Sequence, residues 1–191
     1  DGTSVTLAAR PIADTVPIGG VPVGPRQHRW HAIAPATVIW VEAQDEGNPN
    51  NTVGHRDTIL SSEAPFVEDG QEIARTEFRV SDIAWTQDGT ALITERDRAT
   101  RWTRTQLLYP GSRDLRLLFD RSAENQYDNP GRPLRQTASG VSRSTIRQDT
   151  NAVYLTGNGA SVDGDRPFID RLDLTTLETE RLFRTEIGTY E

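Results

Sequence analysis

The amino-acid sequence predicts an all-β fold, and three observations carry this prediction. A short apolar run ends at Trp85, Asp88-Gly89 follows, and a second apolar run begins at Ala91; Asp-Gly between apolar runs indicates a hairpin, because glycine tolerates a positive φ. Similar apolar runs begin at Ala36 and Ala152, 55 residues before and 61 residues after Ala91. No segment sustains a helical pattern beyond two turns. Because repeats of this length in an all-β chain are typical of propeller blades, we predict a partial β-propeller of about three four-stranded blades.

The first blade is expected at residues 27–79. Residues 1–26 before it are interpreted as a strand of a preceding blade, at 4–10, and a connector rich in Pro and Gly. The second strand of the unit is a continuous apolar run, as expected for a strand that is buried on both faces. Segment 45–54 is polar and is expected to be a solvated turn. The four strands of this unit are expected at 27–32, 36–43, 56–61 and 72–78.

Two further blades are expected, at residues 80–121 and 144–191, joined by a polar connecting loop at 122–143. Their second strands again read as buried apolar runs, and the outer strand at 115–120 mixes charged with apolar residues. The strands of the second blade are expected at 80–86, 91–96, 103–109 and 115–120. Those of the third are expected at 144–148, 152–156, 169–174 and 180–184.

The composition excludes several classes of protein. The 191 residues carry 28 acidic and 21 basic side chains, a net charge of −7, so we expect no nucleic-acid partner, because phosphate binding needs a basic face. No apolar run approaches the ~20 residues of a membrane helix, so no membrane partner is expected. The absence of Cys excludes disulfides and thiolate metal sites. Every basic residue is Arg, which indicates a GC-rich, bacterial genome. The chain begins with Asp1 and contains no Met, so we interpret it as a fragment of a longer protein.

Two serines stand in contexts that approach the nucleophile elbow of a serine hydrolase, which usually reads Gly-x-Ser-x-Gly. Gly159-Ala160-Ser161-Val162-Asp163 and Gly140-Val141-Ser142-Arg143-Ser144 both lack the second Gly. No helical pattern follows either motif, although the elbow requires a strand-to-helix turn. We therefore expect hairpin loops here and assign no catalytic residue.

Metal ligation is not supported by the pattern of potential ligands. His28 and His31 are three residues apart on an expected strand and would face opposite sides, because strand side chains alternate. Asp163-Gly164-Asp165 resembles part of a calcium loop, but the rest of the ligand set is missing and Asp-Gly is a common turn. We expect structural or surface histidines, no metal and no cofactor.

Three arginines, Arg98, Arg101 and Arg104, surround Trp102. A cation cluster beside an aromatic ring can bind a carboxylate, so Arg101 and Arg104 are candidate substrate-binding residues. The alternative is a solvated strand whose arginines pair with acidic neighbours such as Glu95 and Asp97.

A series of short motifs occurs in order along the chain. They are Pro17-Ile18-Gly19-Gly20, Gly24-Pro25-Arg26, Pro35-Ala36-Thr37-Val38-Ile39-Trp40-Val41-Glu42-Ala43, His55-Arg56-Asp57, Ala64-Pro65-Phe66, Asp82-Ile83-Ala84-Trp85, Thr103-Arg104-Thr105, Leu118-Phe119-Asp120-Arg121-Ser122, Gly157-Asn158-Gly159-Ala160-Ser161 and Gly164-Asp165-Arg166-Pro167-Phe168. Together they resemble the β-propeller region of the prolyl oligopeptidase family, in its glutamyl endopeptidase branch. The resemblance extends from about residue 10 to residue 191.

The resemblance implies a non-catalytic part of a serine peptidase. Peptidases of this family join a propeller to a C-terminal α/β-hydrolase domain that holds the Ser, Asp and His of the triad, and that domain is not part of these residues. The propeller would act as a lid that screens substrates by size and shapes the cleft, with the peptide substrate bound through the missing domain. The parent would cleave after acidic residues and is expected to be periplasmic or secreted.

Two other classes of protein remain as alternatives. One is a stand-alone propeller module that binds a protein or peptide. The other is a propeller glycosidase, which would need paired carboxylates at a central pit, whereas the acidic residues here fall mostly at turns and outer strands. For the fragment itself we expect a homodimer through the cut blade faces. Those faces are expected to expose apolar side chains of the inner strands: Ile39, Val41, Leu92, Ile93, Val153 and Leu155.

Overall fold

The computed structural model describes residues 12–67, 69–137 and 143–188, together with residues 4, 6, 8 and 9. These residues form antiparallel strands and one short 3-10 turn, η1 (Ala13–Thr15), and contain no α-helix. None of their helical segments is long and apolar enough to cross a membrane. The all-β fold class is therefore confirmed. The strand expected at 4–10 is not found in the residues of this segment that the structure describes (4, 6, 8 and 9), and residues 5, 7 and 10 lie outside the described residues.

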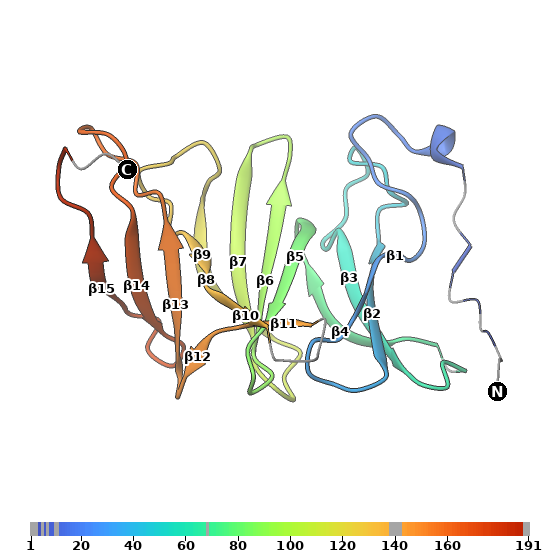
Figure 1. Ribbon diagram of the computed structural model, residues 1–191. Helices are drawn as coiled ribbons and strands as arrows, with labels where there is room; N and C mark the ends of the chain where they lie inside the picture. Colours follow the sequence, from blue (N-terminus) through green and yellow to red (C-terminus); the bar gives the residue numbers. More distant parts are fainter. Residues whose placement is uncertain are drawn as a thin grey trace.

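Three sheets follow one another along the chain and lie side by side in the same order (Figure 1). Sheet one has the order β1-β2-β3-β4 and sheet two the order β5-β6-β7-β8, with every neighbouring pair antiparallel. Their strands are β1 (Arg26–Trp30), β2 (Thr37–Ala43), β3 (Asp57–Glu63), β4 (Gln71–Thr76), β5 (Arg79–Trp85), β6 (Ala91–Asp97), β7 (Trp102–Leu108) and β8 (Leu115–Ser122). All eight strands lie where the sequence places them, within two residues at each end.

The Asp88-Gly89 turn between β5 and β6 forms as expected. Gly89 has φ 93°. The Asp88 carboxylate accepts hydrogen bonds from the Thr86 hydroxyl at 2.6 Å and from the Thr90 amide at 3.0 Å. Thr86 and Thr90 also pair through their backbones at 2.9 Å. The aspartate therefore holds the turn while glycine supplies the positive φ.

The inner edge of sheet three is formed by two short strands, β9 and β12, instead of one continuous strand. The order of the sheet is β12-β13-β14-β15, and β9 pairs with β13 on the same side as β12. Between β9 and β12 the chain leaves the sheet as the β10–β11 hairpin. The strands are β9 (Arg132–Pro133), β10 (Arg135–Thr137), β11 (Ser144–Ile146), β12 (Gln148–Asp149), β13 (Ala152–Gly157), β14 (Phe168–Asp173) and β15 (Thr179–Arg184).

This inner edge differs from the sequence-based expectation. The strand expected at 144–148 is divided between β11 and β12, and the loop expected at 122–143 contains β9 and β10. Among its described residues the segment carries one buried apolar side chain, Ile146, which packs into the core. A single apolar anchor does not produce the alternation that marks a strand in sequence.

Sheet two is buried on both faces, as its apolar strands predict. On one face Ile83, Trp85 and Ile93 pack against Ile39 and Ile59 of sheet one. On the other face a second cluster joins sheet two to sheet three; it contains Ala84, Leu92, Leu107, Ile146, Val153, Leu155 and Leu172. The side chains alternate between the two clusters because strand residues point to opposite faces.

These two cores correct one expectation about the outer faces. Ile39, Val41, Leu92, Ile93, Val153 and Leu155 are all at most 3% exposed. They lie between the sheets of this chain and not on its two lateral faces. Their alternation along each strand does not say which neighbour covers them, so the sequence could not separate inner from outer faces.

Charged side chains also join sheet one to sheet two. Asp57 of β3 and Asp45, which follows β2, are buried carboxylates. Arg79 of β5 contacts both, at 2.9 Å from Asp57 and 2.6 Å from Asp45. Arg26 pairs with Asp57, and Arg56 lies 2.6 Å from Asp45. Burial lowers the pKa of Arg26, and the attraction of Asp57 opposes this effect.

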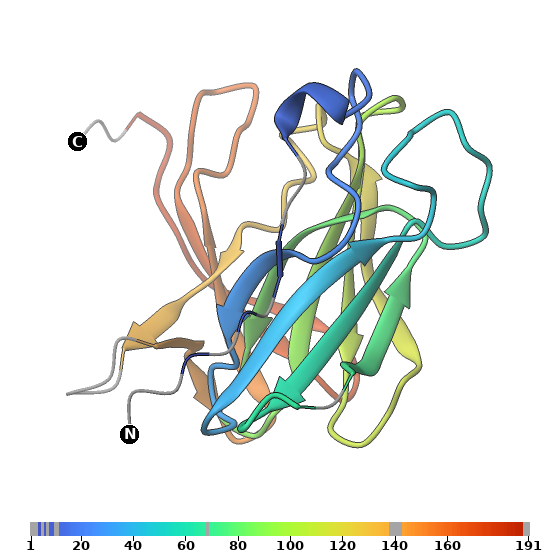
Figure 2. The ribbon, with the colours of Figure 1, turned by 90° about the vertical axis from the view of Figure 1, so that its right-hand side faces the viewer.

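The β10–β11 hairpin extends from sheet three past the inner edges of the other two sheets; in Figure 2 it lies beside sheet one, on the side of β1. Arg135 of β10 lies 2.7 Å from Asp82 of β5. Arg143, just before β11, donates hydrogen bonds to the carbonyls of His31 at 3.1 Å and Ala34 at 3.3 Å. Residues more than a hundred positions apart in the chain are thereby held together.

Candidate functional site

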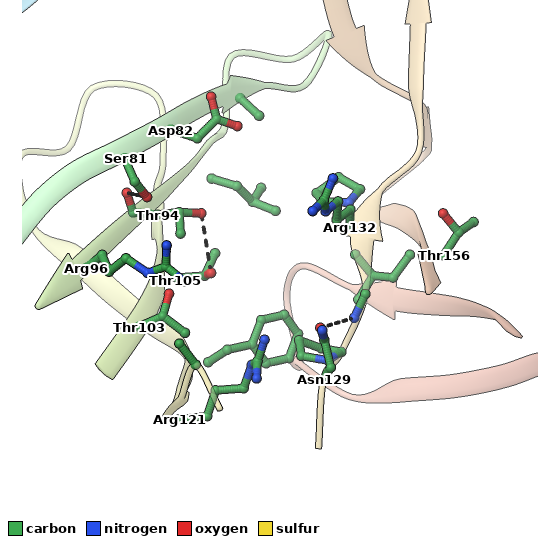
Figure 3. Close-up of a pocket in the computed structure, with 18 of the residues that line it drawn as sticks. Ser81, Asp82, Thr94, Arg96, Thr103, Thr105, Arg121, Asn129, Arg132 and Thr156 are labelled. Carbon is green, nitrogen blue, oxygen red and sulfur yellow. Dashed lines mark hydrogen bonds between the residues drawn. The ribbon is translucent and has the colours of Figure 1, made fainter. Parts of the chain in front are cut away.

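A cleft of about 790 Å³ opens between sheet two and the start of sheet three (Figure 3). We call it the arginine cleft. Sheet two supplies one wall. The connection after β8, strand β9 and two residues of β13 supply the other. The volume lies within the range of about 300–1,000 Å³ that is usual for ligand sites.

The sheet-two wall is built in rows that follow the strand register. Arg96 of β6 lies opposite Thr103 of β7, and Thr103 lies opposite Arg121 of β8. Because paired residues share a face, all three side chains point toward the cleft. Thr94 and Thr105 form the next row, with their hydroxyls 3.5 Å apart. Deeper in the sheet the row is apolar and belongs to the core.

The opposite wall depends on a close backbone approach at Gly131. Gly131 has φ +83°, and a Cβ there would lie 2.4 Å from the carbonyl oxygen of Thr156. The Asn129 side chain accepts the Gly131 amide hydrogen bond at 3.1 Å. This turn brings Arg132 of β9 to the side of the cavity facing Arg96 and Arg121 (Figure 3).

The charge of the cleft is opposite to that of the whole chain. Its lining includes Arg96, Arg121, Arg132 and Arg135, and the one carboxylate that the described residues contribute belongs to Asp82. Asp82 is already paired, with Arg135 at 2.7 Å and with Arg29 at 3.3 Å. Among the described residues, no carboxylate lies within 4 Å of the guanidinium of Arg96, Arg121 or Arg132.

Arg121 is held in place by the backbone. Its Nη1 donates hydrogen bonds to the carbonyls of Ser122 at 3.0 Å and Asn125 at 2.8 Å. Burial lowers the pKa of Arg121; Asp128 opposes this and the nearby Arg96 adds to it. Two like charges on one wall, with no carboxylate of the described residues within 4 Å of either guanidinium, make the cleft able to bind an anion.

The two arginines selected from the sequence lie elsewhere. Arg101 is in the turn between β6 and β7, has φ 55°, and pairs with Glu124 at the exposed end of sheet two. Arg104 lies on the face of β7 that points toward sheet one. It pairs with Glu77 and with Asp120, in the latter case at 3.1 Å, and its guanidinium stacks over the Phe78 ring at 4.4 Å.

Arg104 also lines a second cavity, of about 640 Å³, which further includes His55 and Glu72. The structure does not bring Arg101 and Arg104 together around one site. Their role in substrate binding stays a prediction. Both arginines pair with acidic residues, as the alternative reading of this strand expects, although the partners differ from Glu95 and Asp97.

Glu95 is a buried acid that the sequence did not single out. It lies in β6, is 0% exposed, and accepts hydrogen bonds from the Phe78 amide at 2.7 Å and the Gln106 side chain at 2.6 Å. Burial raises its pKa, and these hydrogen bonds oppose the shift. Both carboxylate oxygens are satisfied, so Glu95 serves as a structural link.

Nothing in the described residues forms a nucleophile–base pair around Ser161. The Ser161 hydroxyl donates a hydrogen bond to the Gly164 carbonyl at 2.7 Å, within a tight turn. His31 has its Nδ1 within hydrogen-bonding distance of the Ile33 and Ala34 amides, at 3.2 and 3.1 Å, and its ring packs on Trp85 at 4.0 Å. Burial lowers the pKa of His31, and Arg143 adds to this effect. Ser142 lies outside the described residues.

The potential metal ligands are dispersed in the described part of the chain, where no group of three or more His, Cys, Asp or Glu residues could hold a metal ion. His28 stacks near Trp40, at 6.3 Å between ring centroids, and His31 packs on Trp85. Asp163 and Gly164 form part of a turn in which Gly164 has φ +101°. His28 lies in β1 and His31 follows that strand, and each packs against a different tryptophan.

No pattern in the sequence singles out Arg96, Arg121 and Arg132 of the cleft. They lie far apart in the sequence, in β6, β8 and β9, and no local motif joins them. Pairing the expected strands in register would have aligned Arg96 with Thr103 and Arg121. The approach of Arg132 depends on the turn at Gly131, which strand pairing alone does not give.

Two curated proteins are similar to nearly the whole chain. The first, named "Probable glutamyl endopeptidase, chloroplastic", from Oryza sativa subsp. japonica, is 35% identical over 194 residues, which cover 96% of this chain and 21% of that protein. A protein of the same name from Arabidopsis thaliana is 35% identical over 195 residues, which cover 96% of this chain and 20% of that protein. The chain thus spans about a fifth of the length of these relatives. No protein-family profile and no solved structure matches it.

Proposed function

We propose that this chain is a non-catalytic part of a serine-type peptidase. The observation that carries the proposal is the similarity of 96% of the chain to two proteins named as probable glutamyl endopeptidases. The chain corresponds to about a fifth of those proteins, so the catalytic machinery would lie in other parts of the parent. The parent reaction would be acyl transfer to a serine, with histidine as the base.

Within the parent, the three sheets would be successive blades of a β-propeller. Each of the first two sheets is a four-stranded antiparallel meander, and the third has the same strand order with a divided inner strand. The face-to-face packing of neighbouring sheets supports this arrangement. A propeller beside an α/β-hydrolase domain would limit the size of substrates that reach the nucleophile and would shape the cleft around them.

The purified chain alone should therefore not cleave peptides. A chromogenic peptide with glutamate before the scissile bond should be turned over by the parent and not by this chain, with Ser161→Ala measured in parallel. Turnover by the chain that disappears in Ser161→Ala would contradict the proposal and identify Ser161 as a nucleophile. The gating role is tested in the parent. It should cleave short peptides and leave intact folded proteins that contain the same cleavage sequences.

The alternative function is a stand-alone binding module for a protein or peptide. The arginine cleft is the observation that favours it, because a charged cleft can bind a ligand without any catalytic group. The gene region after the codon for Glu191 separates the two: a Gly-x-Ser-x-Gly elbow followed by a helical pattern supports the peptidase.

A further inference from the structure

We propose that the arginine cleft is a binding site for an acidic segment of a polypeptide. Arg96 and Arg121 on one wall and Arg132 on the other would contact its carboxylates. That the occupant is a polypeptide rests on the proposed function. The site itself is independent of that function and contains none of the residues considered for catalysis.

The cleft is positively charged in a negatively charged chain. The chain carries −7 overall, yet four of the five charged side chains that line the cleft are arginines. Three of them have no carboxylate within 4 Å among the described residues, whereas Arg101 and Arg104 outside the cleft are paired. A cavity lined by one sign of charge concentrates ligands of the opposite sign. The missing negative charge is what an acidic ligand would supply.

Arginines stand on both walls of the cleft. Arg96 and Arg121 stand in one row across β6, β7 and β8, so their backbones are two strand spacings apart, about 10 Å. Arg132 comes from the opposite wall (Figure 3). Arginines on two facing walls favour an extended ligand with several carboxylates over a single small anion. In an extended peptide, carboxylates at alternate residues lie on one side and about 7 Å apart, less than the spacing of the two backbones, and the long arginine side chains can span the difference.

Apolar and hydroxyl-bearing side chains line the cleft beside the arginines. Leu92, Phe119 and Leu155 give the cleft an apolar floor, and the hydroxyls of Thr103 and Thr105 lie between the arginines. Apolar walls with a few convergent polar groups are typical of ligand sites. Guanidinium groups bind carboxylates through two parallel hydrogen bonds, which gives orientation as well as attraction.

The test is isothermal titration of the purified chain with a capped peptide, acetyl-Glu-Gly-Glu-Gly-Glu-Gly-amide. The matched peptide carries Gln in place of each Glu, and inorganic phosphate is titrated separately. We expect the Glu peptide to bind and the Gln peptide to bind at least tenfold more weakly, with the difference decreasing as salt is added.

The variants are Arg96→Gln and Arg132→Gln, with Arg113→Gln as the matched control. Arg113 is exposed and lies before β8, whereas the cleft is at the other end of that strand. Each cleft variant should weaken binding of the Glu peptide about tenfold, as expected for loss of a charged hydrogen bond, and Arg113→Gln should leave it unchanged. Arg121→Gln is not used alone, because Arg121 also supports the backbone at Ser122 and Asn125.

The inference is overturned if the Glu and Gln peptides bind equally, if Arg96→Gln and Arg132→Gln behave like Arg113→Gln, or if phosphate binds with this dependence on the arginines while the Glu peptide does not. None of these outcomes bears on peptidase activity. Conversely, a parent without peptidase activity would contradict the proposed function. The measured binding of the peptide to the cleft would not change.

Discussion

Asp57 of β3 lies against Arg79 of β5, with Oδ1 of the aspartate 2.9 Å from Nη1 of the arginine. The other oxygen of Asp57 accepts the Val80 amide hydrogen bond at 2.7 Å, and the carboxylate is fully buried. One side chain of sheet one thereby satisfies both a charge and a backbone donor of sheet two. The contact between the two sheets is charged as well as apolar at this point.

Asp57→Ala should destabilise the chain by about 3–5 kcal/mol, because it removes the ion-pair partner of buried Arg26 and the acceptor of the Val80 amide, while Arg79 keeps only Asp45. Urea unfolding followed by tryptophan fluorescence measures the change. The control is Asp163→Ala, at an exposed turn, which should change stability by at most about 0.5 kcal/mol. Equal effects of the two substitutions would show that the buried pair does not hold the sheets together.

Glu95→Gln should make the chain more stable at pH 7. The pKa of Glu95 is raised by burial, so the folded state binds more protons than the unfolded state. The resulting loss of stability develops as pH rises from the ordinary glutamate pKa, about 4.3, through the raised value. Gln keeps an oxygen for the Phe78 amide and presents its NH2 to the Gln106 side chain, whose amide must turn over to offer its oxygen. The substitution removes the titration, so the stability difference between the two proteins should disappear below about pH 4.

The measurement is the free energy of unfolding at several pH values for Glu95→Gln, with Glu63→Gln as the control. Glu63 is exposed at the end of β3 and has no part in the buried contacts of Glu95. A difference between Glu95→Gln and the unsubstituted protein that stays constant from pH 4 to pH 7 would refute the assigned cause.

Gly131→Ala should destabilise the chain by about 1–3 kcal/mol, because an alanine there has an unfavourable positive φ and its Cβ meets the Thr156 carbonyl. Thermal melting is sufficient to detect a change of this size. Gly54→Ala is the matched control, since a Cβ at Gly54 meets nothing within 4 Å. If the two variants melt at the same temperature, the wall of the arginine cleft does not depend on the close approach at Gly131.

Arg101 and Arg104 are tested in the parent protein. Each guanidinium is already paired with carboxylates, so a substrate would have to displace Glu124 or the pair Glu77 and Asp120. Exposed ion pairs contribute only about 0–1 kcal/mol to stability, so a well-placed substrate carboxylate can displace the acidic partner of either arginine. We expect Arg104→Ala or Arg101→Ala to reduce the preference for Glu over Gln in kcat/KM. An unchanged preference in both variants removes these residues from the proposed substrate site.

Association of the chain depends on its two lateral faces. The face of sheet three away from sheet two exposes Ile169 at 39% and Phe183 at 54%, and near sheet one Trp30 is 54% exposed. We propose that two copies of the chain bury one of these two lateral faces against each other in a symmetric dimer. Light scattering over a concentration series measures this, and Phe183→Glu should favour the monomer. A single 21.2 kDa species at all concentrations would exclude the dimer.

The sequence by itself determined the strands of sheets one and two, the turn at Asp88-Gly89 and the buried second strand of each unit. These features arise locally: alternation has a period of two residues, and a turn needs a few residues of defined φ. The similarity of the motifs to the glutamyl endopeptidase branch was also readable from residue order, and the relatives found bear the corresponding name.

Only the tertiary structure decided which charged side chains meet. Arg96, Arg121 and Arg132 share a cleft because of strand register and a turn at Gly131, while Arg101 and Arg104 are paired on other surfaces. It also decided that Ile39 and Leu155 lie between sheets, and that residues 144–149 divide between a hairpin and an inner edge. Strand register and sheet packing bring together residues that are distant in the chain, so no local sequence pattern specifies these contacts. Each contact stabilises the fold only after the sheets have packed together.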